Sequence, residues 1–280
     1  MKYGTEWASG VEPLINRVRR ISQLSHRMPT SGHGVLPMLR SLGYIHDPTN
    51  CEFGIVYEFP PESKDPTVFS LYTAIKTKKS RADHPSLTQR FALASSLVRH
   101  ALDLHSIQWL HKTVAGKTPQ PYFIGFDLAR FNNDTTFSVG PGAAEQVEEY
   151  HHPAYQRLLN VEGNPGSQLV TGPERYRQEF DYYSIGLVLL EIAVWKPLGD
   201  ILKDLIKKRP GITPEKTRQE LLLNYMGLVA SYMGDKYAGA VRRCLSFYDD
   251  MSGNPRKDYQ GYVRAGFRRV VVDELDSCIV

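Results

Sequence analysis

The apolar positions of the first sixty residues predict one amphipathic helix followed by two strands. Residues 11–24 carry Leu, Ile and Val at helical spacing, with arginines between them. Residues 35–45 and 53–59 have the apolar runs of strands, and a loop rich in turn formers joins them. The second strand should end at the pair of prolines that follows it, because proline cannot donate to a strand ladder. We therefore expect a small helix-plus-hairpin unit over residues 1–60.

The rest of the chain, residues 61–280, is patterned mainly for helices. Residues 86–110 are long and periodic, and residues 184–194 are nearly all apolar, as expected of a helix buried on all sides. Further helices are expected over 198–207, 214–233, 236–248 and 259–275. The expected fold class is therefore α+β, with a small N-terminal unit and a larger, mainly α-helical C-terminal unit.

Residues 131–178 interrupt this pattern with glycines, prolines and polar side chains. A long irregular segment in a compact domain is usually functional or mobile. We expect this insertion to bind a partner or to take part in regulation, and a plain surface insertion is the alternative.

Composition narrows the classes of protein without naming one. The 280 residues are 41% hydrophobic and 23% charged, with a net charge of +4, which is ordinary for a globular protein. The three cysteines lie far apart and without metal-ligand spacing, so no disulfide framework or zinc site is predicted. No signal peptide and no membrane-spanning run is visible, and an intracellular, cytoplasmic location is expected. Basic residues do not interleave with aromatic ones, so no nucleic-acid partner is expected.

Three segments, in the correct order, resemble motifs of protein kinases. Residues 53–59 resemble the strand that runs into the kinase hinge, with Tyr57 at the gatekeeper position and Glu58 at the start of the hinge. Residues 104–113 resemble the end of the long helix and the start of the catalytic loop. Residues 181–192, the strongest match, resemble the buried helix that anchors the large lobe.

A protein-kinase-like fold is what this resemblance implies, with a truncated N-lobe over 1–60 and a helical C-lobe over 61–280. Within it, Asp181 and Gly186 would be structural residues. Asp181 would cap the buried helix and accept backbone N–H bonds from the loop near His111, as its counterpart does in kinases. The nearest resemblance is to kinase-like domains of filamentous fungi that are associated with HeLo-type (prion-inhibition) domains. In those the loop is Trp-Leu-His-Lys and the metal segment Gly-Phe-Asp or Gly-Phe-Glu, as in 109–112 and 125–127 here.

The catalytic positions that the resemblance assigns are degenerate. Residues 123–130 resemble the kinase metal-binding segment with two residues exchanged, so Gly125 stands where the magnesium ligand should be and the Asp moves to 127. Glycine offers no carboxylate to a hard cation. The base position, after His111 and Lys112, is Thr113, whose hydroxyl is a very poor base near neutral pH.

Other parts of the phosphoryl-transfer machinery are also missing from the expected places. No glycine-rich loop is seen, and the helix after the strand has no Glu where the ion pair with lysine is needed. Lys2 is the candidate for the strand lysine, and an ordinary terminal lysine is the alternative. Asp127 is the one weak candidate for a metal ligand, and a turn-forming Asp is the alternative.

The sequence therefore predicts a pseudokinase that acts as a binding or regulatory module in intracellular signalling, with a protein partner. No cofactor is expected. Two alternatives remain open. One is an active atypical ATP-dependent protein kinase that uses Asp127 and Lys112 with ATP and magnesium. The other is an unrelated helical interaction protein.

Overall fold

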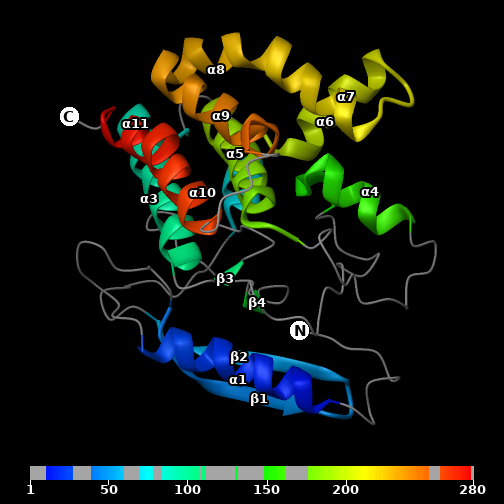
Figure 1. Ribbon diagram of the computed structural model, residues 1–280, viewed down its shortest axis with the longest axis vertical. Coiled ribbons are helices and arrows are strands. Elements are labelled where there is room, and N and C mark those ends of the chain that lie inside the picture. Colours follow the sequence, from blue (N-terminus) through cyan, green and yellow to red (C-terminus); the bar gives the residue numbers. More distant parts are fainter. Residues whose placement is uncertain are drawn as a thin grey trace.

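The computed structural model describes residues 11–27, 39–59, 70–77, 84–106, 109–110, 130–131, 148–161, 176–251 and 259–278. A helix and a two-stranded hairpin lie at one end, and a larger body of helices lies at the other (Figure 1). Two short strands, β3 (Trp109–Leu110) and β4 (Arg130–Phe131), pair antiparallel and are drawn between these two parts (Figure 1).

The N-terminal unit consists of α1 (Glu12–Arg27), β1 (Ser41–Asp47) and β2 (Glu52–Tyr57). The strands are antiparallel, so that Ile45 stands opposite Gly54, and the register is irregular near the start of β1. The turn between the strands is held by Asp47 at the end of β1, whose Oδ1 accepts the backbone N–H groups two and three residues later.

The apolar stripe of α1 packs on the hairpin. Leu14 and Val18 of the helix and Phe53 of β2 form a small buried cluster. Ile21, one turn further along α1, belongs instead to the main hydrophobic cluster of the helical body. The amphipathic pattern of α1 therefore serves both the hairpin and the junction with the body.

The helical body contains the remaining described helices, which have the following bounds: α2 (Leu71–Thr77), α3 (Leu87–Ser106), η4 (Glu148–Tyr150), α4 (Pro153–Val161), α5 (Gln178–Val194), α6 (Leu198–Lys208), α7 (Pro214–Glu220), η5 (Leu221–Tyr225), α8 (Met226–Met233), α9 (Asp235–Met251), α10 (Tyr259–Phe267), η6 (Arg268–Val272) and α11 (Asp273–Asp276).

Helix α5 lies at the centre of this body (Figure 1). Every residue from Gln178 to Ala193 is buried, and the helix contacts α3, α6, α8 and α9. Its apolar side chains point in all directions, because neighbouring helices cover it on all sides. Its last turn ends at Trp195, which adopts a left-handed conformation (φ 51°).

Two helices of the body change their winding without a break. Helix α7 continues through the π-helical η5 into α8, and α10 continues through the π-helical η6 into α11. Thr213 starts the first of these helices as an N-cap, with its side chain accepting a bond from the backbone N–H of Lys216. A π-helical turn shifts the side-chain register, so the faces before and after it point in different directions.

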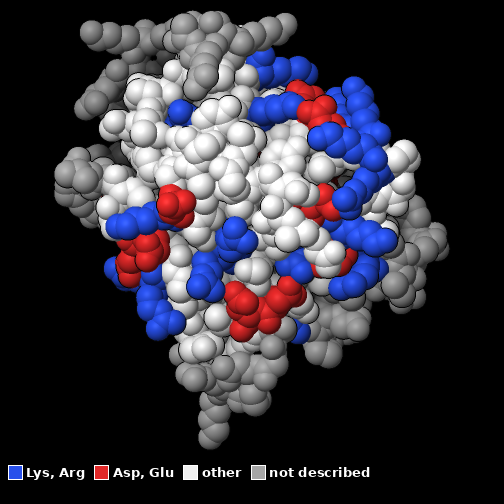
Figure 2. Space-filling view, turned by 90° about the horizontal axis from the view of Figure 1, so that it is seen from above, with Lys and Arg blue, Asp and Glu red and all other residues white. Residues whose placement is uncertain are grey.

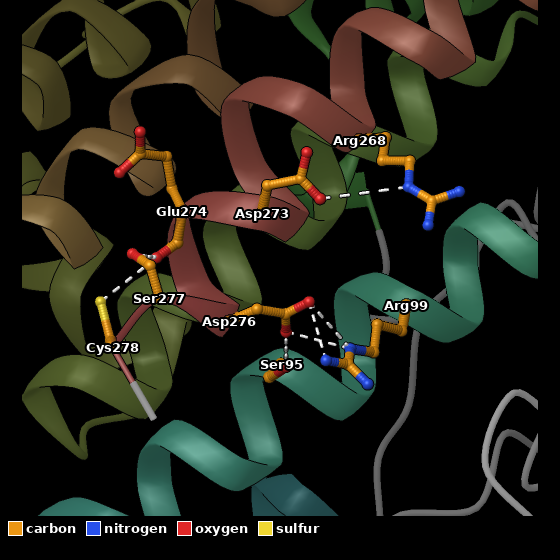
Figure 3. A network of polar contacts seen from close by, with 8 residues as sticks. All are labelled: Ser95, Arg99, Arg268, Asp273, Glu274, Asp276, Ser277 and Cys278. Carbon is orange, nitrogen blue, oxygen red and sulfur yellow. Dashed lines mark hydrogen bonds and ion pairs between the residues drawn. The ribbon is translucent and has the colours of Figure 1, made fainter. Parts of the chain in front are cut away.

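The C-terminal helix is held against α3 by a polar network (Figure 3). Asp276 accepts hydrogen bonds from the Ser95 hydroxyl (2.5 Å) and from Arg99 Nε (3.0 Å), and Arg99 Nη2 lies 2.7 Å from its other oxygen. Residues far apart in the chain are thereby joined, and α11 closes the side of the body formed by α3 (Figures 1 and 3).

The predicted fold class, α+β with a helical bulk, is confirmed, while the finer kinase-like assignment stays a prediction. In the strand expected over 35–45, residues 39 and 40 precede β1, which begins at Ser41, and residues 35–38 lie outside the described residues. Helix α5 begins earlier than expected, at Gln178. The expectation that residues 131–178 are irregular is wrong for α4, whose start carries His152 and a proline suited to a first helical turn. Among the described helices, none combines the length and the apolar character that crossing a bilayer would require.

Candidate functional site

The N-terminal end of α5 carries a buried carboxylate, Asp181, that the sequence singled out. Its Oδ2 lies 2.9 Å from His105 Nε2, at the end of α3, and its Oδ1 accepts the Tyr176 hydroxyl at 2.7 Å. All three side chains are almost fully buried. The carboxylate therefore joins α3, α5 and the segment that leads into α5.

The expected capping role of Asp181 is wrong. The N-cap of α5 is Arg177, and no side chain caps it. Asp181 is already inside the first turn, so its carboxylate is directed at neighbouring elements rather than at the first N–H groups of its own helix. The expected bonds from the loop near His111 lie outside the described residues.

The three groups are arranged so that two donors face one acceptor. Burial raises the pKa of the Tyr176 hydroxyl well above its usual range, and the charge of Asp181 adds to the rise. Tyr176 therefore stays a hydrogen-bond donor. An ionised carboxylate only accepts, so the imidazole of His105 donates from Nε2. Its Nδ1 is buried and has no hydrogen-bond partner among the described residues.

Gly186 lies one turn further along α5, where the helix approaches α9 most closely. A Cβ atom at this position would lie 2.7 Å from Cys244 Cβ and 3.1 Å from Leu245 Cδ2. The first of these distances is too short for any real pair of Cβ atoms, and Cys244 Cβ is fixed to the backbone of α9. Glycine is therefore required by the packing of the two helices.

The hinge candidates lie at the end of the hairpin. Tyr57 is the last residue of β2 and pairs with Ser41. Glu58 follows it, is exposed, donates its backbone N–H to the Arg40 carbonyl at 2.8 Å and forms a 3.1 Å ion pair with the Arg40 side chain. A surface pair of this kind contributes little to stability. The described contacts of Glu58 are made at the hairpin.

The other predicted site residues lie outside the described residues: Lys2, His111, Lys112, Thr113, Gly125 and Asp127. Within the described ranges, no group of three or more His, Cys, Asp or Glu side chains is placed to hold a metal ion. The expectation of a chain without a metal cofactor stays a prediction.

Sequence reasoning gave no role to a second buried carboxylate, Glu191, near the end of α5. Its Oε1 accepts the Tyr150 hydroxyl at 2.8 Å and the Leu198 backbone N–H at 2.6 Å, so it joins η4 and the start of α6 to α5. Burial raises its pKa to about 7, although the two hydrogen bonds oppose the rise. A single acidic residue in the apolar run of residues 184–194 was the signal that could have identified it.

A cluster of rings packs around His152 at the start of α4. Its Nδ1 accepts the Ala154 backbone N–H at 3.1 Å, and its ring stacks on Phe180 with centroids 5.2 Å apart. Tyr183 and Tyr248 contact the same ring. Burial lowers the pKa of His152 to about 3, so the imidazole is neutral and serves as a packing element.

A buried arginine lies near this cluster. Arg218 of α7 pairs with Glu215 and Asp249, and its Nη1 donates to the Leu245 carbonyl. The carboxylates that neutralise Arg218 here come from α7 and α9.

No protein-family model matches the chain, and a search of curated proteins finds no match. The interpretation of the site therefore depends on its residues and their geometry.

Proposed function

We propose that the chain is a kinase-like pseudoenzyme that acts by binding and does not transfer phosphate. The observation that carries the proposal is the replacement of both catalytic carboxylates, by Thr113 and Gly125, in a chain that keeps Asp181 buried at the start of its central helix. Phosphoryl transfer requires carboxylates to hold metal ions and to orient the attacking hydroxyl.

The order of the elements supports the kinase-like part of this proposal. A helix-plus-hairpin unit precedes a helical body, and a helix buried on all sides lies at the centre of that body. The link between His105 and Asp181 joins the end of α3 to α5, so it orients the chain just before the catalytic-loop-like segment 109–113.

Energetics support the loss of catalysis. Removing one preorganised electrostatic group typically costs about 100- to 1,000-fold in rate. The sequence lacks the base, the metal ligand at 125 and the helix Glu together, and although such losses are not additive, ordinary turnover is not compatible with them.

A nucleotide-binding and transfer assay tests the proposal. Purified protein should show no thermal shift with ATP and magnesium and no incorporation of radiolabelled phosphate. A magnesium-dependent shift of several degrees would contradict it. If transfer is seen and disappears in Asp127→Ala while Asp204→Ala retains it, the active-kinase alternative replaces the proposal.

A further inference from the structure

One surface of the helical body lacks the charges that a solvent-facing helix normally carries. Residues 221–233, which form η5 and α8, contain no charged side chain. The exposed positions of this stretch, here called the α8 face, are Leu223, Asn224, Gly227, Leu228, Ser231 and Tyr232. An exposed helix face is usually polar or charged, so this one calls for a physical reason.

The α8 face is apolar at its ends and open in its middle. Leu223 is 76% exposed, the largest value among the described large hydrophobic residues, and Leu228 and Tyr232 are 41% and 40% exposed. A Cβ atom added at Gly227 would meet no atom within 4 Å. A second helix can therefore approach the backbone of α8 at Gly227 while Leu223 and Tyr232 contact its sides.

The packing of the body does not require this face. The π-helical turn η5 buries Leu221 and turns Leu223 outward. The buried side of the same helix is supplied by Met226, Val229 and Met233. The exposed leucines therefore contribute little to the core.

Basic side chains flank the α8 face on two sides. On one side, Glu220 receives hydrogen bonds from Arg209 and from Asn224 of the face, which places the basic end of α6 next to it. Lys207 and Lys208 in that end form no ion pair with a described acidic residue.

The second flank is on α9. Arg242 stands two turns from Asp249 on that helix and so shares its side, and Asp249 contacts Arg218 of α7. Arg242 therefore lies on the side of α9 that faces α7, the helix that continues through η5 into α8. Figure 2, which looks onto the α8 side of the molecule, shows an uncharged area with Lys and Arg to its right, where Figure 1 draws α6 and α7. Some Asp and Glu lie among these basic residues, and further charged residues lie to the left and below.

We propose that the α8 face docks an amphipathic helix of a partner protein whose flanks carry Asp or Glu. Its apolar stripe lies on Leu223, Leu228 and Tyr232, its backbone passes close to Gly227, and its acidic flanks meet the basic residues at the end of α6 and on α9. Charge complementarity selects this occupant, since a basic helix would be repelled at both flanks. The inference rests on the proposed binding role and names the class of partner for it.

A selection from a surface-display library of randomised helices of about five turns tests the inference. Wild-type protein should enrich helices with apolar residues at i, i+3, i+4 and i+7 and acidic residues beside them. Affinity for an enriched peptide should fall at least tenfold in Leu223→Asp, as expected for an apolar anchor that is replaced by a charge, and should fall also in Leu228→Ser. The double variant Lys207→Glu/Lys208→Glu should weaken binding and reduce its salt dependence.

The matched control is Leu42→Asp, which changes an exposed leucine of β1, at the opposite end of the molecule from α8 (Figure 1). It should bind the enriched peptides as the wild type does, and a thermal melt of each variant should show that it is folded at the temperature of the binding assay.

Several results would overturn the inference. These are enrichment of basic helices, and enrichment that is no greater on the wild-type protein than on the Leu223→Asp protein. Self-association lost in Leu223→Asp would assign the face to a second copy, and binding to phosphatidylserine vesicles lost in that variant would assign it to a membrane. The ATP assay above is independent of all these outcomes, so failure of the binding-module proposal and failure of the docking surface are told apart.

Discussion

At the scale of single residues, the buried acceptors decide how the helical body is joined. Asp181→Ala would remove the buried acceptor of the His105 N–H and of the 2.7 Å bond from the Tyr176 hydroxyl. The donors that remain stay buried and no longer gain the bond that offset their loss of hydration. We therefore expect the free energy of unfolding to fall by about 3 kcal/mol. Urea denaturation measures it.

The control for this substitution is Asp204→Ala. Asp204 forms a 2.5 Å ion pair with Lys196, but both side chains are nearly half exposed. An exposed pair contributes at most about 1 kcal/mol. Equal losses in the two variants would show that the Asp181 group does not hold the elements together.

Glu191 gives a prediction about pH. Its folded pKa, about 7, is raised above the ordinary value of 4.5, so the folded state binds its proton more tightly than the unfolded chain does. Its contribution to stability is therefore present at low pH and is lost as pH rises from about 4.5 through 7, by up to about 3 kcal/mol. Glu191→Gln keeps an acceptor without the charge, so it should gain stability relative to wild type over this range.

The comparison must be made as a difference between variant and wild type at each pH. Burial lowers the pKa of His100 to about 4 and that of His152 to about 3. These two histidines therefore make the folded state less stable as pH falls below 6.5, which is opposite to the effect of Glu191. Glu58→Gln, at an exposed carboxylate, is the control variant for the same pH series. A pH-independent difference for Glu191→Gln would contradict the assignment of this titration.

At the scale of elements, one glycine in the contact of α5 with α9 and one on the exposed face of α8 give substitutions of opposite sign. Gly186→Ala forces a Cβ against Cys244 Cβ, so the helices must separate, and we expect a loss of about 1–3 kcal/mol. Gly227→Ala adds a methyl group in open space within a helix, so it should stabilise the chain by about 0.5–1 kcal/mol. Thermal and urea unfolding measure both, and a gain in Gly186→Ala would refute the close approach.

The sequence predicted most helices because their apolar residues repeat at the helical period or fill the whole surface of the helix. The start of α5 was missed because its first turn contains Glu179 and Asp181, whose polar character hid a buried segment. The π-helical turns are invisible to a pattern search based on the ordinary helical period. The acceptors for His105 and Tyr150 lie far away in the sequence, at Asp181 and Glu191, so no local signal could pair them.

At the scale of the whole molecule, the N-terminal unit and the helical body have largely separate cores. Leu14, Val18 and Phe53 form a cluster of their own, and α1, β1 and β2 contact mainly one another. Ile21 is the described residue of α1 that belongs to the cluster of the body. A region with a small core of its own opens at a lower free energy than the main core.

This division predicts where amide hydrogen exchange responds to a core substitution. Val18→Ala should speed exchange in α1, β1 and β2 and leave α5 unchanged, because a cavity in the small core destabilises only the unit that it supports. Val229→Ala, at an equally buried valine of α8, is the matched control and should speed exchange in the helical body. Ile21→Ala should affect both, since its side chain lies at the junction. If Val18→Ala instead speeds exchange in α5 as much as in α1, the chain unfolds as one unit.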